Sequence, residues 1–379
     1  MNLAGLRALF PSAASCVHLN HAGTSPIARP AAEAVQNVMD ELMSDDSFLA
    51  FKNHEKRQAE LRAAFGRMLN VSPASLAFVK NTSHGLSIAA DALPLAPGDN
   101  VVLPPGEYPA NVYPWIAQKK RGVETRIAPA RNAETNVIAE EDLMAACDAR
   151  TRVLSVSWVQ WGTGQRLDLA RLGQFCRARN IVFAVDIVQG LGALRLDLGS
   201  LPVDIAAAGC HKWLLAPAGI GVLYVRPDLL PHLLPTNVGW NSVTSAVRWE
   251  NLHFDLKNDA SRFEEGTPNI LGTAGLLASV RLLELAGFET VERHVLDMAS
   301  RLRDGLQERG CRVVSPGEHE RQRSGIVAFR HPRRSNEDVL HALTEKKVRV
   351  AVRCGNVRFS PHVENDASDV ERALAALPV

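Results

Sequence analysis

The sequence predicts an α/β protein, with a large domain built on a mostly parallel sheet and a smaller α+β domain after it. Short apolar runs bounded by Gly and Pro, such as residues 181–185 and 220–225, are typical of strands buried on both faces. Helical segments alternate with these runs, which favours right-handed βαβ units. The final part of the chain again alternates strand and helix, which predicts the second, smaller domain.

The elements follow from apolar spacing and from turn residues. Pro30 begins the first long helix, a position that proline favours because its missing N–H has no partner there in any case. Helices are predicted at residues 30–43, 55–69, 86–93, 112–120, 142–147, 169–179, 336–344 and 368–377, with one long helical region at 273–309. Strands are predicted at residues 76–79, 101–103, 124–127, 153–156, 181–186, 203–208, 220–225, 326–329, 348–352 and 357–359. Residues 18–26 are predicted as a polar turn before the first helix.

Length and composition narrow the class of protein. A chain of 379 residues fits one large domain plus a smaller one, and 46% hydrophobic and 22% charged residues are typical of soluble globular proteins. The net charge of +1 argues against binding nucleic acid or a membrane surface through bulk electrostatics. No span approaches the roughly 20 apolar residues of a membrane helix. Six dispersed cysteines without a C-x-x-C pair indicate reduced thiols, so we expect a cytoplasmic protein.

Asp186 and Lys212 end two of the predicted buried strands, where ligands bind in sheets of this kind. A nucleophilic lysine must be partly neutral, which burial favours, whereas a buried carboxylate needs a cationic partner. Pyridoxal phosphate (PLP) meets both needs, because its aldehyde forms a Schiff base with lysine and its protonated ring nitrogen pairs with an acid. Taken singly, the two residues are equally well explained as a surface lysine and a turn-capping aspartate.

A second candidate site lies at residues 80–85, where a strand runs through Asn, Thr, Ser and Gly into a helix. Free N–H groups and hydroxyls at a helix N-terminus form an anion site. Taken alone, this joint is better explained as an ordinary helix cap.

Together these motifs resemble the class V aminotransferase family, which contains cysteine desulfurases, isopenicillin N epimerase-like proteins and cystine C–S lyases. The resemblance rests on D-x-x-Q-G at 186–190, G-C-H-K-W at 209–213, G-x-G at 219–221, N-T-S-H-G at 81–85, E-Y-P-A-N at 107–111, F-E-E-G-T-P-N at 263–269 and V-R-F-S-P-H at 357–362. It covers nearly the whole chain in the expected order. It implies a fold-type-I PLP enzyme with a seven-stranded mixed sheet, a large domain at 1–260 with a substrate-entrance segment at 1–28, and a small domain at 261–379.

The resemblance also implies a role for each matching residue around the PLP ring. Lys212 would be the catalytic residue and carry the cofactor as a Schiff base. Asp186 would hold the ring nitrogen, Gln189 would hydrogen-bond the ring O3′, and Tyr108 would stack on the ring face.

Further matching residues would bind the phosphate and the substrate. Thr82, Ser83 and His211 would bind the cofactor phosphate. Gly266 and Thr267 would reach the phosphate of a neighbouring subunit, which implies a homodimer with shared active sites. Arg358 would clamp the carboxylate of a small amino-acid substrate through its bidentate fork, and Asn20 would line the entrance.

Departures from the family pattern narrow the expected reaction. Gly209 replaces a serine that commonly helps desulfurases to hold the phosphate. Cys354 lies almost directly before Arg358, with little room for the mobile loop that carries a desulfurase nucleophile. A cysteine desulfurase is therefore disfavoured. Trp158 and Trp161 favour the lyase and epimerase-like branches and are expected either to crowd the cofactor or to belong to the core.

The expected activity is PLP chemistry at the Cα of an amino acid, aminotransferase-like, with C–S β-lyase or epimerase activity as alternatives. A catalytically inactive protein that acts through protein contacts is the alternative of another class. We expect no metal site, because His18-x-x-His21 has no further ligand at metal spacing.

Overall fold

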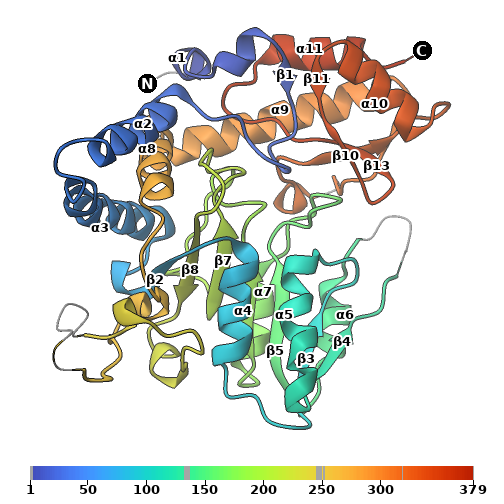
Figure 1. The fold of residues 1–379 in the computed structure, drawn as a ribbon. Coiled ribbons are helices and arrows are strands. Elements are labelled where there is room, and N and C mark those ends of the chain that lie inside the picture. Colours follow the sequence, from blue (N-terminus) through green and yellow to red (C-terminus); the bar gives the residue numbers. More distant parts are fainter. Residues whose placement is uncertain (1–2, 132–136, 245–249, 251, 318, 379) are drawn as a thin grey trace.

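The computed structural model describes residues 3–131, 137–244, 250, 252–317 and 319–378. Its main sheet has seven strands in the order β2-β8-β7-β6-β5-β3-β4 (Figure 1). These strands are β2 (Leu76–Val79), β3 (Asn100–Leu103), β4 (Glu124–Ile127), β5 (Thr151–Ser157), β6 (Val182–Asp186), β7 (Ile205–Gly209) and β8 (Gly221–Val225). Strand β8 is antiparallel to both of its neighbours, and every other pairing in the sheet is parallel. The predicted seven-stranded mixed sheet is confirmed.

The apolar strands are buried on both faces, as their composition predicts. In β7, Ile205 and Ala207 face one core cluster, whereas Ala206 and Ala208 face another. Helices α4 (Thr82–Ala92) and α5 (Tyr113–Ile116) cover the first face. The second is covered by α3 (Leu49–Leu69), α7 (Leu169–Arg177) and α8 (Ile270–Ala286). Because helices cover both faces, ligands reach the sheet only at the ends of its strands.

A second, smaller layer carries the C-terminal part of the chain. Its sheet has the order β12-β13-β10-β9, formed by β9 (Arg312–Val313), β10 (Val327–Arg330), β12 (Ala351–Arg353) and β13 (Asn356–Phe359). Helices α9 (Phe288–Glu308), α10 (Asn336–Glu345) and α11 (Ala367–Ala375) pack on it around a separate apolar core. The remaining helices are α1 (Leu3–Arg7), α2 (Arg29–Leu42) and α6 (Glu140–Ala145). The predicted boundary at residue 261 stays a prediction, and α8, which follows it, packs against α2 and α3.

The long helical region predicted at 273–309 is two helices, and the prediction of one continuous element is wrong. Gly287 ends α8 and begins α9 with a φ of 81°, a left-handed conformation that a helix interior does not allow. The two helices meet at an angle of 84°. Among the described residues, no single helix is long and apolar enough to cross a membrane, and α8 and α9 meet that test only when counted together across their bend.

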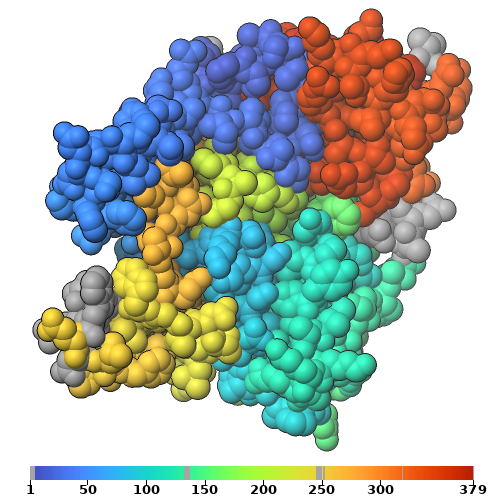
Figure 2. All heavy atoms as spheres, in the orientation of Figure 1, coloured from blue at the N-terminus to red at the C-terminus, as the bar shows by residue number. Residues whose placement is uncertain are grey.

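The N-terminal segment contains a strand that the sequence did not predict. β1 (Val17–His18) pairs in parallel with β11 (Val348–Arg349), and Asn20 continues the pairing with Ser360. Val17 and Leu19 thereby join the apolar core of the C-terminal layer. In Figure 2 the blue N-terminal residues lie directly against the red C-terminal part. The segment predicted as a turn therefore links the two ends of the chain.

The Gly192→Ala variant should be clearly destabilised. Gly192 has a φ of +103°, and an added Cβ would lie 2.2 Å from the backbone oxygen of Trp213, so the substitution adds a clash to a strained backbone. We expect the free energy of unfolding to fall by about 3 kcal/mol, measured by urea denaturation. Gly310→Ala is the matched control, because Gly310 has a φ of +72° and open space around it, and it should lose only about 1 kcal/mol. Equal losses in the two variants would contradict close packing at Gly192.

Candidate active site

Asp186 and Lys212 lie at one edge of the main sheet. Asp186 is the last residue of β6, and Lys212 follows the end of its parallel neighbour β7. Both line a pocket of about 220 Å³. The pocket is lined by Ala22, Gly23, Asn81, Thr82, Ser83, Tyr108, Ala110, Trp161, Asp186, Val188, Gln189, His211, Lys212, Arg353 and Arg358. Nearly all of the predicted site residues therefore share one cavity.

Asp186 is a buried acid, and its side chain is half unsatisfied. The residue is only 2% exposed, and Oδ1 accepts a hydrogen bond of 2.9 Å from the backbone N–H of Val188. No donor among the described residues bonds to Oδ2. Burial raises the pKa of Asp186, and the nearby carboxylate of Glu107 raises it further. A cationic N–H in the pocket would bond to Oδ2 and offset the cost of burial.

The Lys212 amine is held in the same pocket, close to an aromatic wall. Burial lowers the pKa of Lys212, and the positive charges of Arg358 and Arg353 lower it further, against the attraction of Asp186. Its Nζ lies 5.5 Å from the ring centroid of Tyr108. The ring of Trp161 meets that of Tyr108 edge-on, with centroids 5.3 Å apart. A lysine with a lowered pKa is a better nucleophile and a better base near neutral pH.

The N-terminus of α4 forms a polar cup on one side of the pocket. Asn81 caps the helix by accepting a 2.9 Å bond from the N–H of His84, and the Thr82 hydroxyl accepts a 2.8 Å bond from the N–H of Gly209. A Cβ on Gly209 would lie 3.2 Å from Nδ1 of His211. The His211 ring therefore occupies the space beside Gly209 where a larger side chain would project.

The entrance segment is tied to the pocket floor. The Gln189 amide donates a 3.0 Å bond to the backbone oxygen of Ala22 and accepts one of 3.0 Å from the Trp213 indole. The N–H of Ser25 donates a 3.0 Å bond to the backbone oxygen of His211, and its hydroxyl donates to that of Lys212. Gln189 keeps one amide hydrogen for a ligand, so its predicted bond to a ring oxygen remains available.

Arg358 is a buried cation without a counter-charge in the pocket. It is 1% exposed, and burial lowers its pKa. Nη1 donates to the backbone oxygen of Trp161 at 2.6 Å and Nη2 donates to Oδ1 of Asn20 at 3.4 Å, while Nε is buried without a partner. Both acceptors are neutral. The guanidinium is therefore suited to binding a carboxylate, as predicted.

The structure separates some residues that the sequence could not distinguish. Trp158 is a core residue, because its ring fills the space that a Cβ on Gly190 would need, whereas Trp161 lines the pocket. Gly266 and Thr267 line a different cavity of about 270 Å³, beside Lys80 and His84. Arg353 lines the active-site pocket, and sequence reasoning missed it. Its spacing from Arg358 in two neighbouring strands was the available signal.

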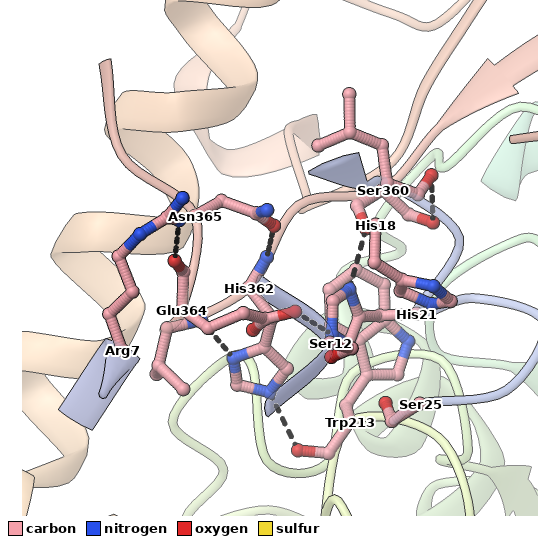
Figure 3. Close-up of polar contacts among 12 residues, drawn as sticks. Arg7, Ser12, His18, His21, Ser25, Trp213, Ser360, His362, Glu364 and Asn365 are labelled. Carbon is pink, nitrogen blue, oxygen red and sulfur yellow. Dashed lines mark hydrogen bonds and ion pairs between the residues drawn. The ribbon is translucent and has the colours of Figure 1, made fainter. Parts of the chain in front are cut away.

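A buried polar cluster supports the entrance segment from below (Figure 3). His21 lies 2.8 Å from the Glu364 carboxylate, and its Nδ1 lies 3.0 Å from the backbone oxygen of Ser360. The His362 Nε2 donates a 2.8 Å bond to the backbone oxygen of Trp213, next to Lys212. Burial acts to raise the pKa of Glu364, but attraction by His21 outweighs it and holds that pKa below its usual range. This cluster connects the C-terminal layer to the lysine loop.

The histidines of His18-x-x-His21 are used within the protein. Nε2 of His18 lies 3.0 Å from the backbone oxygen of Thr24, and His21 contacts Ser360 and Glu364. Within residues 3–131, 137–244, 250, 252–317 and 319–378, no group of three potential ligands is placed to hold a metal ion.

The pocket residues fit pyridoxal phosphate. Oδ2 of Asp186 can accept from a protonated ring nitrogen, and Lys212 presents an amine for the aldehyde. The N-terminus of α4, with Thr82 and Ser83, suits a phosphate. The orphan Nε of Arg358 adds an acceptor-free position for a substrate carboxylate.

Solved structures with the same fold place this site among the fold-type-I PLP enzymes. C-DES, in a variant with glycine covalently linked to its PLP cofactor, matches with a TM-score of 0.91 and 26% identity over 97% of this chain and 98% of that one. A cysteine desulfurase from Thermococcus onnurineus matches with a TM-score of 0.86 and 25% identity over 98% and 96%. The chain belongs to the class-V aminotransferase family, whose model matches residues 17–372. Its cofactor is pyridoxal phosphate.

Sequence relatives within this family have different activities in their names. An uncharacterized aminotransferase of Schizosaccharomyces pombe is 29% identical over 84% of this chain and 80% of its own length. Isopenicillin N epimerase of Streptomyces clavuligerus is 31% identical over 83% and 81%. A probable cysteine desulfurase of Pyrococcus abyssi is 29% identical over 85% and 82%. The comparisons therefore do not support our prediction that a desulfurase is disfavoured.

The stability of the protein should fall with acidification because buried histidines in this cluster resist protonation. Burial lowers the pKa of His362 to about 3 and that of His18 to about 4, from an ordinary value of 6.5. Below pH 6.5 the unfolded chain binds these protons and the folded protein does not, so stability is lost as pH falls towards those values. Replacing one such histidine, as in His362→Gln, should reduce the slope of unfolding free energy against pH by about 1.4 kcal/mol per unit in that window.

Chemical denaturation between pH 6.5 and pH 4 would measure these slopes. His341→Gln is the control, because His341 is an exposed histidine on α10 and its loss should leave the slope unchanged. Equal slopes for the wild type and His362→Gln would show that His362 is protonated in the folded protein.

Proposed function

We propose that this protein is a PLP-dependent enzyme that acts at the Cα of a small amino acid, with Lys212 as its catalytic residue. One observation carries the proposal: a buried acid and a lysine of lowered pKa lie at the ends of adjacent parallel strands, in one pocket with an uncompensated buried arginine. Asn20 belongs to the substrate wall, because it bonds to the same arginine.

Each of these residues contributes one physical step. The bound cofactor supplies an electron sink for the electron pair left at Cα. Arg358 binds and orients the substrate carboxylate, which fixes the position of Cα. Lys212 removes the Cα proton, and Asp186 holds the proton on the ring nitrogen through Oδ2. Tyr108 and Trp161 form an aromatic wall that limits the access of water.

The overall reaction depends on where the proton taken up by Lys212 is delivered. We propose transamination first, since the family is that of the class-V aminotransferases. C–S β-lyase activity is the second candidate, because C-DES, a cystine C–S lyase, matches 97% of this chain with a TM-score of 0.88. Epimerisation has support from the relative of that activity that is 31% identical.

Cysteine desulfurase activity is kept as an outcome of the test below. Relatives of that name favour it, whereas the position of Cys354 argues against this residue as a nucleophile. Cys354 and Gly355 form the two-residue turn between β12 and β13, with φ values of 50° and 70°, and the cysteine lies against Gly162. Burial also raises the pKa of Cys354, which lowers its thiolate fraction.

Lys212→Ala should abolish the visible absorbance of the covalently held cofactor and reduce turnover at least about 1,000-fold, because both the attachment point and the base are lost. Lys52→Ala, an exposed lysine on α3, is the control and should behave as the wild type. The assay incubates purified protein with single amino acids and measures keto acid, pyruvate, sulfide and inversion at Cα.

Three results would contradict parts of this proposal. Wild-type protein without cofactor absorbance would favour a catalytically inactive fold that acts through protein contacts. Sulfide and alanine, both lost in Cys354→Ala, would establish a desulfurase. Turnover that survives in Lys212→Ala would remove the lysine from the mechanism.

We also propose a homodimer, in a cytoplasmic location. Gly266 and Thr267 do not line the active-site pocket of their own chain, which supports their predicted role at the phosphate of a neighbouring subunit. Exposed apolar side chains gather where α2 is followed by α3, a feature typical of interfaces. They are Met39, Met43, Phe48, Leu49 and Phe51.

Sedimentation equilibrium should give twice the chain mass of 41.2 kDa. Phe48→Asp, at a side chain that is 72% exposed, should weaken the dimer at least about tenfold, because a charge would enter an apolar interface. Ile127→Asp, on the edge strand β4, is the control and should leave the mass unchanged. A wild-type monomer at micromolar concentration would contradict the dimer.

A further inference from the structure

The active-site pocket holds more positive charge than the cofactor and a simple amino acid would use. Its described lining contains three cations, Lys212, Arg353 and Arg358, and a single acid, Asp186. Asp186 and Lys212 match the two ends of the cofactor ring, the N-terminus of α4 suits the phosphate, and Arg358 suits the α-carboxylate of the substrate. Arg353 is left without an assigned anion.

Arg353 lies beside Arg358 on the same face of one hairpin. In the β12–β13 pair, Ala351 is opposite Arg358 and Arg353 is opposite Asn356. Residues opposite each other in an antiparallel pair project to the same face, so the two arginines are diagonal neighbours on that face. Diagonal neighbours lie about 7–8 Å apart, within reach of long side chains. Both arginines also lower the pKa of Lys212.

The hairpin backbone that carries Arg353 is firmly held. An added Cβ on Gly162 would lie 2.8 Å from Sγ of Cys354, so the tip packs closely on the segment that follows β5. The Asn356 amide donates a 2.8 Å bond to the backbone oxygen of Cys354, and Arg330 donates one of 2.8 Å to Asn356. The position of Arg353 is therefore fixed, while its side chain is exposed at the pocket mouth.

The Arg353 guanidinium has no acidic partner among the described residues. Its bond to a side-chain or backbone acceptor is to the oxygen of the preceding residue, Val352, at 2.8 Å. By contrast, Arg57, Arg62 and Arg226 are each paired with a carboxylate. An unpaired arginine beside a second unpaired arginine is a site for a second anionic group.

We propose that Arg353 is a specificity-determining residue, and that the substrate is an amino acid with a second carboxylate. The α-carboxylate binds at depth on Arg358, and the second carboxylate, at the far end of the side chain, binds Arg353 at the mouth. This inference rests on the proposed function only in assigning Arg358 to the α-carboxylate.

Equilibrium binding to the cofactor-loaded enzyme tests the inference without any turnover. Isothermal titration calorimetry would compare succinate, glutarate and adipate, each with the monocarboxylate of the same chain length. In the wild type, at least one dicarboxylate should bind about tenfold to a hundredfold more tightly than its monocarboxylate, the range expected for one charge-assisted hydrogen-bonded contact. Arg353→Gln should abolish this preference and leave monocarboxylate binding unchanged, whereas Arg353→Lys should keep part of it.

The matched control is Arg333→Gln, which removes the same charge from an exposed arginine of the same layer, away from the pocket. It should keep the full preference. Equal weakening of both ligand types in Arg353→Gln would place Arg353 at the α-carboxylate or at the cofactor and overturn the inference. A wild-type protein without any dicarboxylate preference would also overturn it.

A kinetic comparison separates this inference from the proposed function. Aspartate, glutamate and 2-aminoadipate would be compared with asparagine, glutamine and norleucine. Arg353→Gln should lower kcat/KM for the acidic members about tenfold or more, mainly through KM, and leave the neutral members unchanged. Dicarboxylate binding that depends on Arg353, with no amino acid turned over, would refute the proposed function alone. Turnover that prefers the neutral members would refute the inference alone.

Discussion

The site depends on the desolvation of two groups of opposite charge that do not neutralise each other. Asp186 and Lys212 share one pocket, yet no ion pair joins them in the part of the chain that the structure describes, and burial moves the pKa of each towards neutrality. Burying a charge without a partner costs several kcal/mol. A ligand with a cationic N–H at one end and an electrophile at the other offsets both costs at once. The rest of the pocket orients that ligand.

Much of this arrangement could be predicted from the sequence, because it depends on local patterns. Buried strands appear as apolar runs, and Asp186 and Lys212 stand directly where those runs end, so the sheet rule brings them together. The features that the sequence missed involve long-range or single-residue effects. β1 is too short to show a strand pattern, and its partner lies more than 300 residues away. The break at Gly287 depends on one backbone conformation inside an otherwise helical pattern.

The same residues that establish the cofactor do not decide among the reactions of the family. Asp186, Lys212 and Arg358 serve the removal of a proton from Cα, a step that transamination, elimination and epimerisation have in common. The difference lies in the residues around the mouth, namely Trp161, the Cys354 turn and Arg353. These come from loops and a hairpin tip, which vary in sequence more readily than the buried strands do. This division explains why relatives of similar identity have such different activities in their names.

The pairing of β1 with β11 also has a consequence for how the protein is made. The entrance segment gains its place through Val348, Arg349 and Ser360, near the end of the chain. During synthesis the large sheet can form as soon as β8 has been made, but residues 17–25 have no partner strand until almost the whole chain has left the ribosome. Contacts of such long sequence separation form late, because the chain entropy of closing the loop must be lost first. The pocket is therefore assembled in two stages, with its floor first and its wall last.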